Sequence, residues 1–179
     1  NQNAQVRELV ERLENSITRM HHTVLDLTEV STLQKGTEKA DFKELSFNEV
    51  LQEVKINLAG EIVASGVEIT ADFTAADKVL FTHKNLYSVI YNLVSNAIKY
   101  RAKDRVPKVQ LTTQEHGNYI RLAVADNGIG IDLIKHEKKI FSLFKRLHEN
   151  TVGSGVGLFI VKRIMENNQG RVEVESKVG

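Results

Sequence analysis

The N-terminal part of the chain has apolar residues at alternating spacings of four and three. The series comprises Val6, Val10, Leu13, Ile17, Met20, Val24 and Leu27. Its mean spacing of 3.5 is the period of a coiled-coil seam, so it predicts a long helix, from Asn3 to about Gln34, that needs a partner helix. An amphipathic helix that packs on its own domain is the alternative. Gly36, within Lys35-Gly36-Thr37, is predicted to cap this helix and act as a hinge.

Beyond residue 36 the spacing changes and predicts a mixed α/β domain. Ser46-Phe47-Asn48-Glu49 is a capping box that starts a helix extending to about Ala64. Apolar spacing predicts further helices at 83–101 and 157–167, strands at 67–73, 79–81, 109–113, 119–125 and 171–176, and a linker with a short edge strand at 37–45. With the helices on one side of the sheet, the fold class is α+β, a two-layer α/β sandwich with a mixed sheet.

Glycines at alternate positions, Gly153, Gly155 and Gly157, come directly before the last predicted helix. Glycines let backbone N–H groups approach an anion, and the N-terminus of the following helix adds its unpaired N–H groups and positive dipole end. The segment lacks the Lys-Ser/Thr pair of a Walker A loop and the spacing of a dinucleotide-binding turn. It predicts a phosphate site, with an ordinary loop before a helix as the alternative.

The helix predicted at 83–101 has a polar face beside its apolar stripe. At about 100° per residue, Asn92, Asn96 and Lys99 lie roughly 120° from the stripe of Leu86, Ile90, Leu93 and Ala97. Amide oxygens can ligate a hard cation and an ammonium can contact phosphate. A solvated polar face is the alternative.

The strand predicted at 119–125 ends in Asp126 and a glycine turn. Apolar Ile120, Leu122 and Val124 alternate along it, so Asp126 is expected on the same inner side and poorly solvated. Such a carboxylate needs a donor, for which a ligand amino group is suitable. The alternative is an aspartate that caps its own turn.

Taken in this order, the segments resemble the GHKL ATPase superfamily and its Bergerat ATP-binding fold, more narrowly the catalytic domain of sensor histidine kinases. The matching motifs are the N box at 92–100, the G1 box Asp126-x-Gly128-x-Gly130, the F box at 141–144 and the G2 box at 153–158. The seam followed by residues 26–33 is similar to the second helix of the dimerisation and histidine-phosphotransfer domain. The resemblance thus implies a partial phosphotransfer helix at 1–36 and a catalytic domain at 37–179, truncated at its C-terminus, where the family usually continues into another strand.

The resemblance implies ATP and Mg²⁺ as cofactors. Asp126 would accept the adenine amino group, Asn96 with Asn92 would bind Mg²⁺, and residues 131–152 would form a lid over ATP. The residues implied in nucleotide binding are Asn92, Asn96, Lys99, Tyr100, Asp126, Gly128, Gly130, Lys145, Gly153, Ser154, Gly155, Val156, Gly157 and Leu158. Those implied in catalysis are Asn92, Lys99 and Arg146. Lys145 and Arg146 are candidates to neutralise charge on the γ-phosphate, with plain surface positions as the alternative.

The implied function is that of a protein-histidine kinase that transfers the γ-phosphoryl group of Mg·ATP to a histidine. The family places this histidine on a preceding helix beside an acidic residue, and no such segment occurs here. His21 and His22 precede Thr23-Val24 and lack the acidic neighbour. We therefore interpret the chain as a fragment without its phosphoacceptor.

Two other functions remain open. One is a different GHKL ATPase or a serine kinase of the anti-sigma type, against which the seam argues. The other is a nucleotide-sensing pseudokinase that acts as a dimeric interaction module. Intact Asn92, Asn96, Asp126 and the G2-box glycines disfavour the pseudokinase.

The amino-acid composition limits the classes of binding partner that the chain is expected to have. The net charge of +1 gives no electrostatic case for nucleic acid, and the absence of cysteine excludes a disulfide framework. No apolar run approaches the roughly 20 residues of a membrane-spanning helix, so a membrane is expected only through upstream segments. The resemblance implies a homodimer in the full-length kinase, a response regulator receiver domain as partner and a cytoplasmic location.

Overall fold

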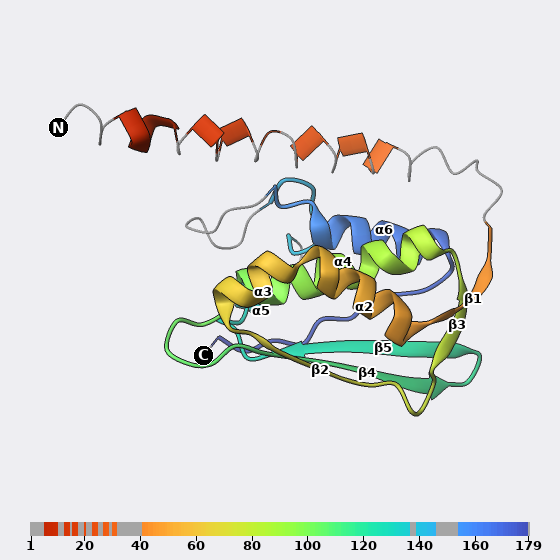
Figure 1. The fold of residues 1–179 in the computed structure, drawn as a ribbon. Helices are drawn as coiled ribbons and strands as arrows, with labels where there is room; N and C mark the ends of the chain where they lie inside the picture. Colours follow the sequence, from red (N-terminus) through yellow and green to blue (C-terminus); the bar gives the residue numbers. More distant parts are fainter. Residues whose placement is uncertain are drawn as a thin grey trace.

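Helices cover one face of a small β-sheet, and a long N-terminal helical arm lies beyond them (Figure 1). The computed structural model describes residues 6–10, 13–14, 16–17, 20, 23–24, 27–28, 30–31, 41–136, 139–145 and 154–178. The elements after the arm are β1 (Lys43–Ser46), α2 (Phe47–Asn57), α3 (Ala59–Ser65), β2 (Glu68–Asp72), β3 (Lys78–Phe81), α4 (His83–Lys99), β4 (Lys108–His116), β5 (Tyr119–Asp126), α5 (Leu133–His136) and α6 (Gly157–Asn167).

The sheet is mixed, as predicted. Its order is β2-β4-β5, with β2 parallel to β4 and β4 antiparallel to β5. The β4–β5 ladder ends with the pair Val109 and Asp126. Strands β1 and β3 form a separate antiparallel ribbon. The predicted α+β sandwich is therefore confirmed.

The predicted helix at 46–64 begins as expected but is interrupted. The Ser46 side chain accepts a hydrogen bond from the Glu49 backbone N–H at 3.4 Å, so the serine half of the capping box is formed. The chain then leaves helical geometry at Leu58 and continues as α3. One continuous helix was the wrong prediction. The Leu58 side chain at this break is in the core, 1% exposed.

The predicted strand at 171–176 is also absent, since residues 171–178 have no assigned strand pairing. The alternation is nevertheless real, because Val172 and Val174 are half-buried while Arg171 and Glu173 are exposed. Apolar residues at every second position indicate which side of an extended segment is buried. A β-strand also needs a neighbouring strand within hydrogen-bonding distance. This segment therefore packs without joining the sheet.

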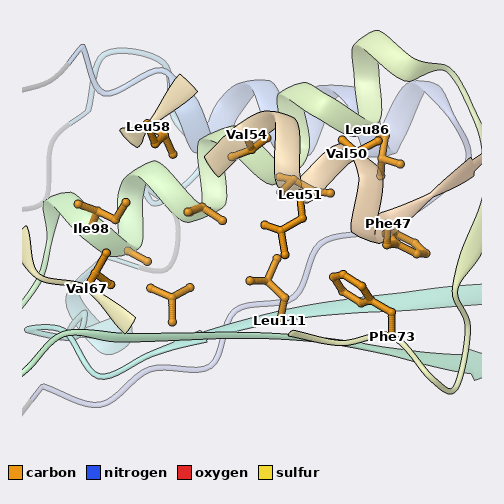
Figure 2. Close-up of a cluster of buried hydrophobic side chains, with 14 residues drawn as sticks. Phe47, Val50, Leu51, Val54, Leu58, Val67, Phe73, Leu86, Ile98 and Leu111 are labelled. Carbon is orange, nitrogen blue, oxygen red and sulfur yellow. The ribbon is translucent and has the colours of Figure 1, made fainter. Parts of the chain in front are cut away.

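Helix α4 packs apolar residues into two clusters. Towards the sheet and α2, Leu86, Ile90 and Ala97 join Leu111 and Phe47 in the main core (Figure 2). Towards α6, Val89 and Leu93 join a second cluster built around Val156, Ile160 and Ile164. The predicted single stripe of Leu86, Ile90, Leu93 and Ala97 is therefore divided, since Leu93 belongs to the α6 side.

The arm is helical at its described positions, and its seam packs on nothing in this chain that the structure describes. The seam residues from Val6 to Leu27 are 45% to 70% exposed. Val30, beyond the seam, is 5% exposed and packs with Val89, Ile160 and Ile164. Among the described residues of the arm, Val30 near its end is therefore the one buried against the domain. In the described part of the chain, no helix is both long and apolar enough to span a bilayer.

Several predicted features fall outside the described residues. They are His21, His22, the hinge at 35–37, Arg146, Gly153 and the lid residues 137–138 and 146–152.

Leu111→Ala tests the main core. Leu111 is 0% exposed, so truncation should lower the free energy of unfolding by about 3 kcal/mol through lost burial and a residual cavity. Leu80→Ala is the matched control, because Leu80 is 68% exposed and its loss should cost no more than about 0.5 kcal/mol. Urea denaturation measures both, and equal effects would show that the core is elsewhere.

Candidate functional site

The polar face of α4 meets the beginning of α6. A Cβ atom at Gly157 would lie 2.6 Å from Asn92 Oδ1 and 3.5 Å from Asn96 Nδ2. Asn92 Nδ2 donates to the Ser88 carbonyl at 2.9 Å and to its hydroxyl at 3.3 Å, which leaves Oδ1 facing Gly157. The predicted common face of Asn92 and Asn96 is thus confirmed, and it lies against the glycine segment.

The N-terminus of α6 is suited to an anion. Val156 occupies the N-cap, where no side chain of the described residues caps the helix, and its own side chain is fully buried in the second apolar cluster. The first backbone N–H groups of α6 are consequently anchored in place without a side-chain acceptor, at the positive end of the helix dipole. Ser154 and Gly155 precede this point and are half-buried, as are Gly157 and Leu158.

The G1 turn is fixed against the end of α4. The Ile129 backbone N–H donates to the Tyr100 carbonyl at 3.0 Å. A Cβ at Gly128 would lie 2.5 Å from the same carbonyl oxygen, so only glycine permits this approach. Lys99 Nζ lies 5.0 Å from the centroid of the Tyr100 ring. These predicted residues of the N box and the G1 box are therefore neighbours.

Asp126 is exposed, which corrects the prediction of a poorly solvated carboxylate. Its Oδ1 accepts a hydrogen bond from the Gly128 backbone N–H at 2.8 Å, the turn-capping contact that was the alternative interpretation. Alternation places a residue on a face of the sheet, but helical cover decides burial, and β5 ends at this residue.

The F-box segment at 141–144 lies beside α6. Lys162 Nζ is 5.4 Å from the Phe141 ring centroid, and Leu143 packs in the second apolar cluster. Phe144 has φ of 59° and is 49% exposed, a costly backbone conformation for a bulky residue. Lys145 is exposed, and its backbone carbonyl oxygen lies 3.0 Å from where a Gly155 Cβ would be. The F box and the G2 box therefore meet.

Two residues near the site were not predicted from the sequence. Lys162 lies over Phe141 as described. Asn127 hydrogen-bonds through its side chain to residues around the start of β4, at 2.8 Å to Lys108 N and 2.9 Å to the Val106 carbonyl. The Asp-Asn-Gly sequence indicated a turn, but it carried no signal for the partner segment.

The side chains of the described residues are suited to hold a metal ion only when a bound nucleotide supplies further ligands. None of them form a group of three or more His, Cys, Asp or Glu side chains able to hold a metal ion. Asn92 and Asn96 supply amide groups beside the N-terminus of α6. A hard cation held here would draw its remaining ligands from water and from the phosphates of a bound nucleotide.

An apolar cleft of about 370 Å³ is lined mainly by residues of the predicted lid, 131–152. Its lining residues are Leu133, Ile134, Ile140, Phe141 and Val174. Four of these residues belong to the predicted lid, and none of the residues listed above as implied in nucleotide binding lines the cleft.

Comparison with known proteins gives a family for most of the domain. A family model described as histidine kinase-, DNA gyrase B-, and HSP90-like ATPase matches residues 82–179. The methanogenesis regulatory histidine kinase FilI of Methanothrix harundinacea is 30% identical over 93% of this chain and 18% of its own length. The phytochrome-like protein Cph1 of Synechocystis is 37% identical over 80% of this chain and 19% of its own length. The chain thus spans about a fifth of these relatives.

Solved structures share the fold. The catalytic domain of histidine kinase ThkA has a TM-score of 0.59 at 28% identity, covering 72% of this chain and 83% of that one. Full-length ShkA in complex with AMPPNP has a TM-score of 0.78 at 23% identity, covering 97% and 36%. ThkA in complex with the response regulator protein TrrA has a TM-score of 0.68 at 24% identity, covering 92% and 45%.

Gly130→Ala tests the packing of the G1 turn. Gly130 has φ of +69°, and an added Cβ would overlap the Lys177 backbone carbonyl. Gly117 has φ of +61° with nothing within 4 Å, so Gly117→Ala isolates backbone strain, about 1 kcal/mol. Gly130→Ala should lower the free energy of unfolding by a further 1 to 3 kcal/mol, roughly, through the clash. Chemical denaturation of both variants measures this, and equal losses would contradict the close approach.

Proposed function

Because the chain belongs to the histidine kinase-, DNA gyrase B-, and HSP90-like ATPase family, we propose that it is the catalytic domain of a sensor histidine kinase, which binds Mg·ATP. It would donate the γ-phosphoryl group to a histidine on a separate helix. The observation that carries the proposal is the convergence of Asn92, Asn96 and the start of α6. The G1 turn adjoins the same helix α4 through Tyr100.

Asp126 is proposed as the adenine anchor. Its Oδ1 is held by Gly128 N–H, which fixes the orientation of the carboxylate and leaves Oδ2 for the adenine amino group. Exposure of Asp126 gives the base access to it. Gly128 and Gly130, which have no side chains, allow the backbone to pass close to the base.

The phosphates are proposed to lie at the N-terminus of α6. Backbone N–H groups from Gly155 onward would donate to them, and Lys99 and Lys145 would add positive charge. Asn96, with Asn92 nearby, would hold Mg²⁺, which when bound offsets phosphate charge. Arg146 stays a candidate for contact with the γ-phosphate.

Phosphoryl transfer would then need a nucleophile held in line. A neutral imidazole nitrogen of the acceptor histidine would form the new N–P bond as the bond from the γ-phosphorus to the bridging oxygen breaks and ADP leaves. The imidazole proton would pass to the acidic neighbour that the family supplies. This chain contributes orientation and charge neutralisation rather than covalent chemistry.

The arm supports an assembly with other helices. Its exposed seam is suited to the helix bundle of a homodimer, with residues 1–36 as part of the phosphotransfer domain and 37–179 as the catalytic domain. A seam of this kind disfavours the anti-sigma type of serine kinase.

We further propose a response regulator receiver domain as the acceptor of the phosphoryl group and a cytoplasmic location.

Asp126→Asn should largely abolish ATP binding without unfolding the domain. The new NH₂ group can oppose the adenine amino group, a loss on the order of 2 to 4 kcal/mol. Calorimetric titration with ATP measures it. Asp104→Asn is the control, because Asp104 is an exposed aspartate paired with Arg105. Unchanged affinity in Asp126→Asn would remove Asp126 from the adenine site.

Asn96→Ala should weaken Mg·ATP far more than metal-free ATP, because an amide oxygen ligand acts only when the cation is present. The affinities are compared in Mg²⁺ and in EDTA. Asn57→Ala, on the exposed side of α2, is the control. A loss of equal size in both conditions would make Asn96 a direct phosphate contact or a structural residue instead.

A further inference from the structure

Asn127 connects the G1 turn to a segment about twenty positions earlier in the chain. Its Oδ1 accepts from Lys108 N at 2.8 Å, and its Nδ2 donates to the Val106 carbonyl at 2.9 Å. Its own backbone N–H donates to the Lys108 carbonyl at 3.3 Å. Both polar atoms of a half-buried side chain are therefore engaged by backbone.

These bonds lie directly after the end of the sheet ladder. Asp126 and Val109 form the last pair of β4 and β5, so the amide of Asn127 takes over where strand pairing stops. The segment that it holds is itself fixed, because the Pro107 carbonyl accepts from Glu68 N at 2.9 Å at the start of β2. Asn127 thereby ties the turn to the remainder of the sheet.

The following residues show why this tie matters for Asp126. Gly128 N–H donates to Asp126 Oδ1, and Ile129 N–H donates to the end of α4. Asp126 is exposed, so packing does not hold its side chain. The direction of its carboxylate depends on the backbone course of the turn, and Asn127 contributes the two side-chain bonds of that turn to the sheet.

We propose that Asn127 is a positioning residue that sets the adenine-binding geometry of Asp126 without touching the nucleotide. This inference rests on the proposed function. A positioning residue for the base should affect recognition of adenine and leave recognition of the phosphates at α6 almost unchanged, because the two are held by different elements.

The experiment titrates the 179-residue chain with ATP, GTP and inorganic triphosphate, all with Mg²⁺, by calorimetry. Asn127→Ala should lower the affinity for ATP by about tenfold, the equivalent of one to two hydrogen bonds. The preference for ATP over GTP should fall in parallel, and the affinity for triphosphate should stay within about twofold, since α6 is unaffected. Asn127→Asp keeps the volume and the Lys108 bond but sets a carboxylate against the Val106 carbonyl, so it should show the same selective loss.

Two controls separate positioning from general stability. Asn118→Ala removes an exposed asparagine at the far end of the β4–β5 hairpin and should change no affinity. Thr113→Val removes a buried hydrogen bond of 2.7 Å to the Ala76 carbonyl, so it should lower the melting temperature and leave the ATP-to-GTP ratio unchanged.

The outcomes distinguish this inference from the proposed function. ATP and triphosphate affinities that fall equally in both Asn127 variants would assign Asn127 a general structural role and overturn the inference. Wild-type ATP affinity in both variants would overturn it too, and if Asp126→Asn still abolishes binding, the proposed function stands. If the wild-type chain does not bind ATP, both the proposed function and the inference about Asn127 are wrong.

Discussion

The double burial of α4 is the constraint on which the rest of the structure depends. Towards the sheet the helix carries Ile90 and Val94, both 0% exposed, and towards α6 it carries Val89 and Leu93. A helix held on two sides cannot rotate about its axis without exposing one of them. The remaining polar face, with Asn92 and Asn96, therefore has one direction available, which is towards the start of α6.

Close backbone approaches then assemble the site around α4. Gly157 admits the Asn92 amide, and Gly128 admits the Tyr100 carbonyl. At both places a side chain would occupy the space that the neighbour fills. The glycines thus let separate segments of the candidate site come together.

Within the described part of the arm, Val30 is the residue that is buried against the domain. Val30 packs between α4 and α6, next to Val89 and Ile160, whereas the seam from Val6 to Leu27 faces solvent. The same two helices carry Asn92 and the N-terminus of α6. A change in the direction of the arm would therefore act on the packing between α4 and α6.

The sequence by itself determined the features that depend on near neighbours in the chain. The 3.6 and 2.0 periods located α4, α6, β4 and β5, and the capping box located the start of α2. The motif spacing predicted the N, G1, F and G2 boxes. These signals were sufficient because helical period, capping and turn chemistry are set by residues within a few positions of one another.

Tertiary structure alone decided the features that depend on distant residues. It left Asp126 exposed at the end of β5, and it left residues 171–178 unpaired despite their alternation. It also divided the α4 stripe between two clusters and gave Asn127 partners at Val106 and Lys108. Burial and hydrogen-bond partners come from segments that the chain brings together only on folding, so no local pattern of polar and apolar residues encodes them.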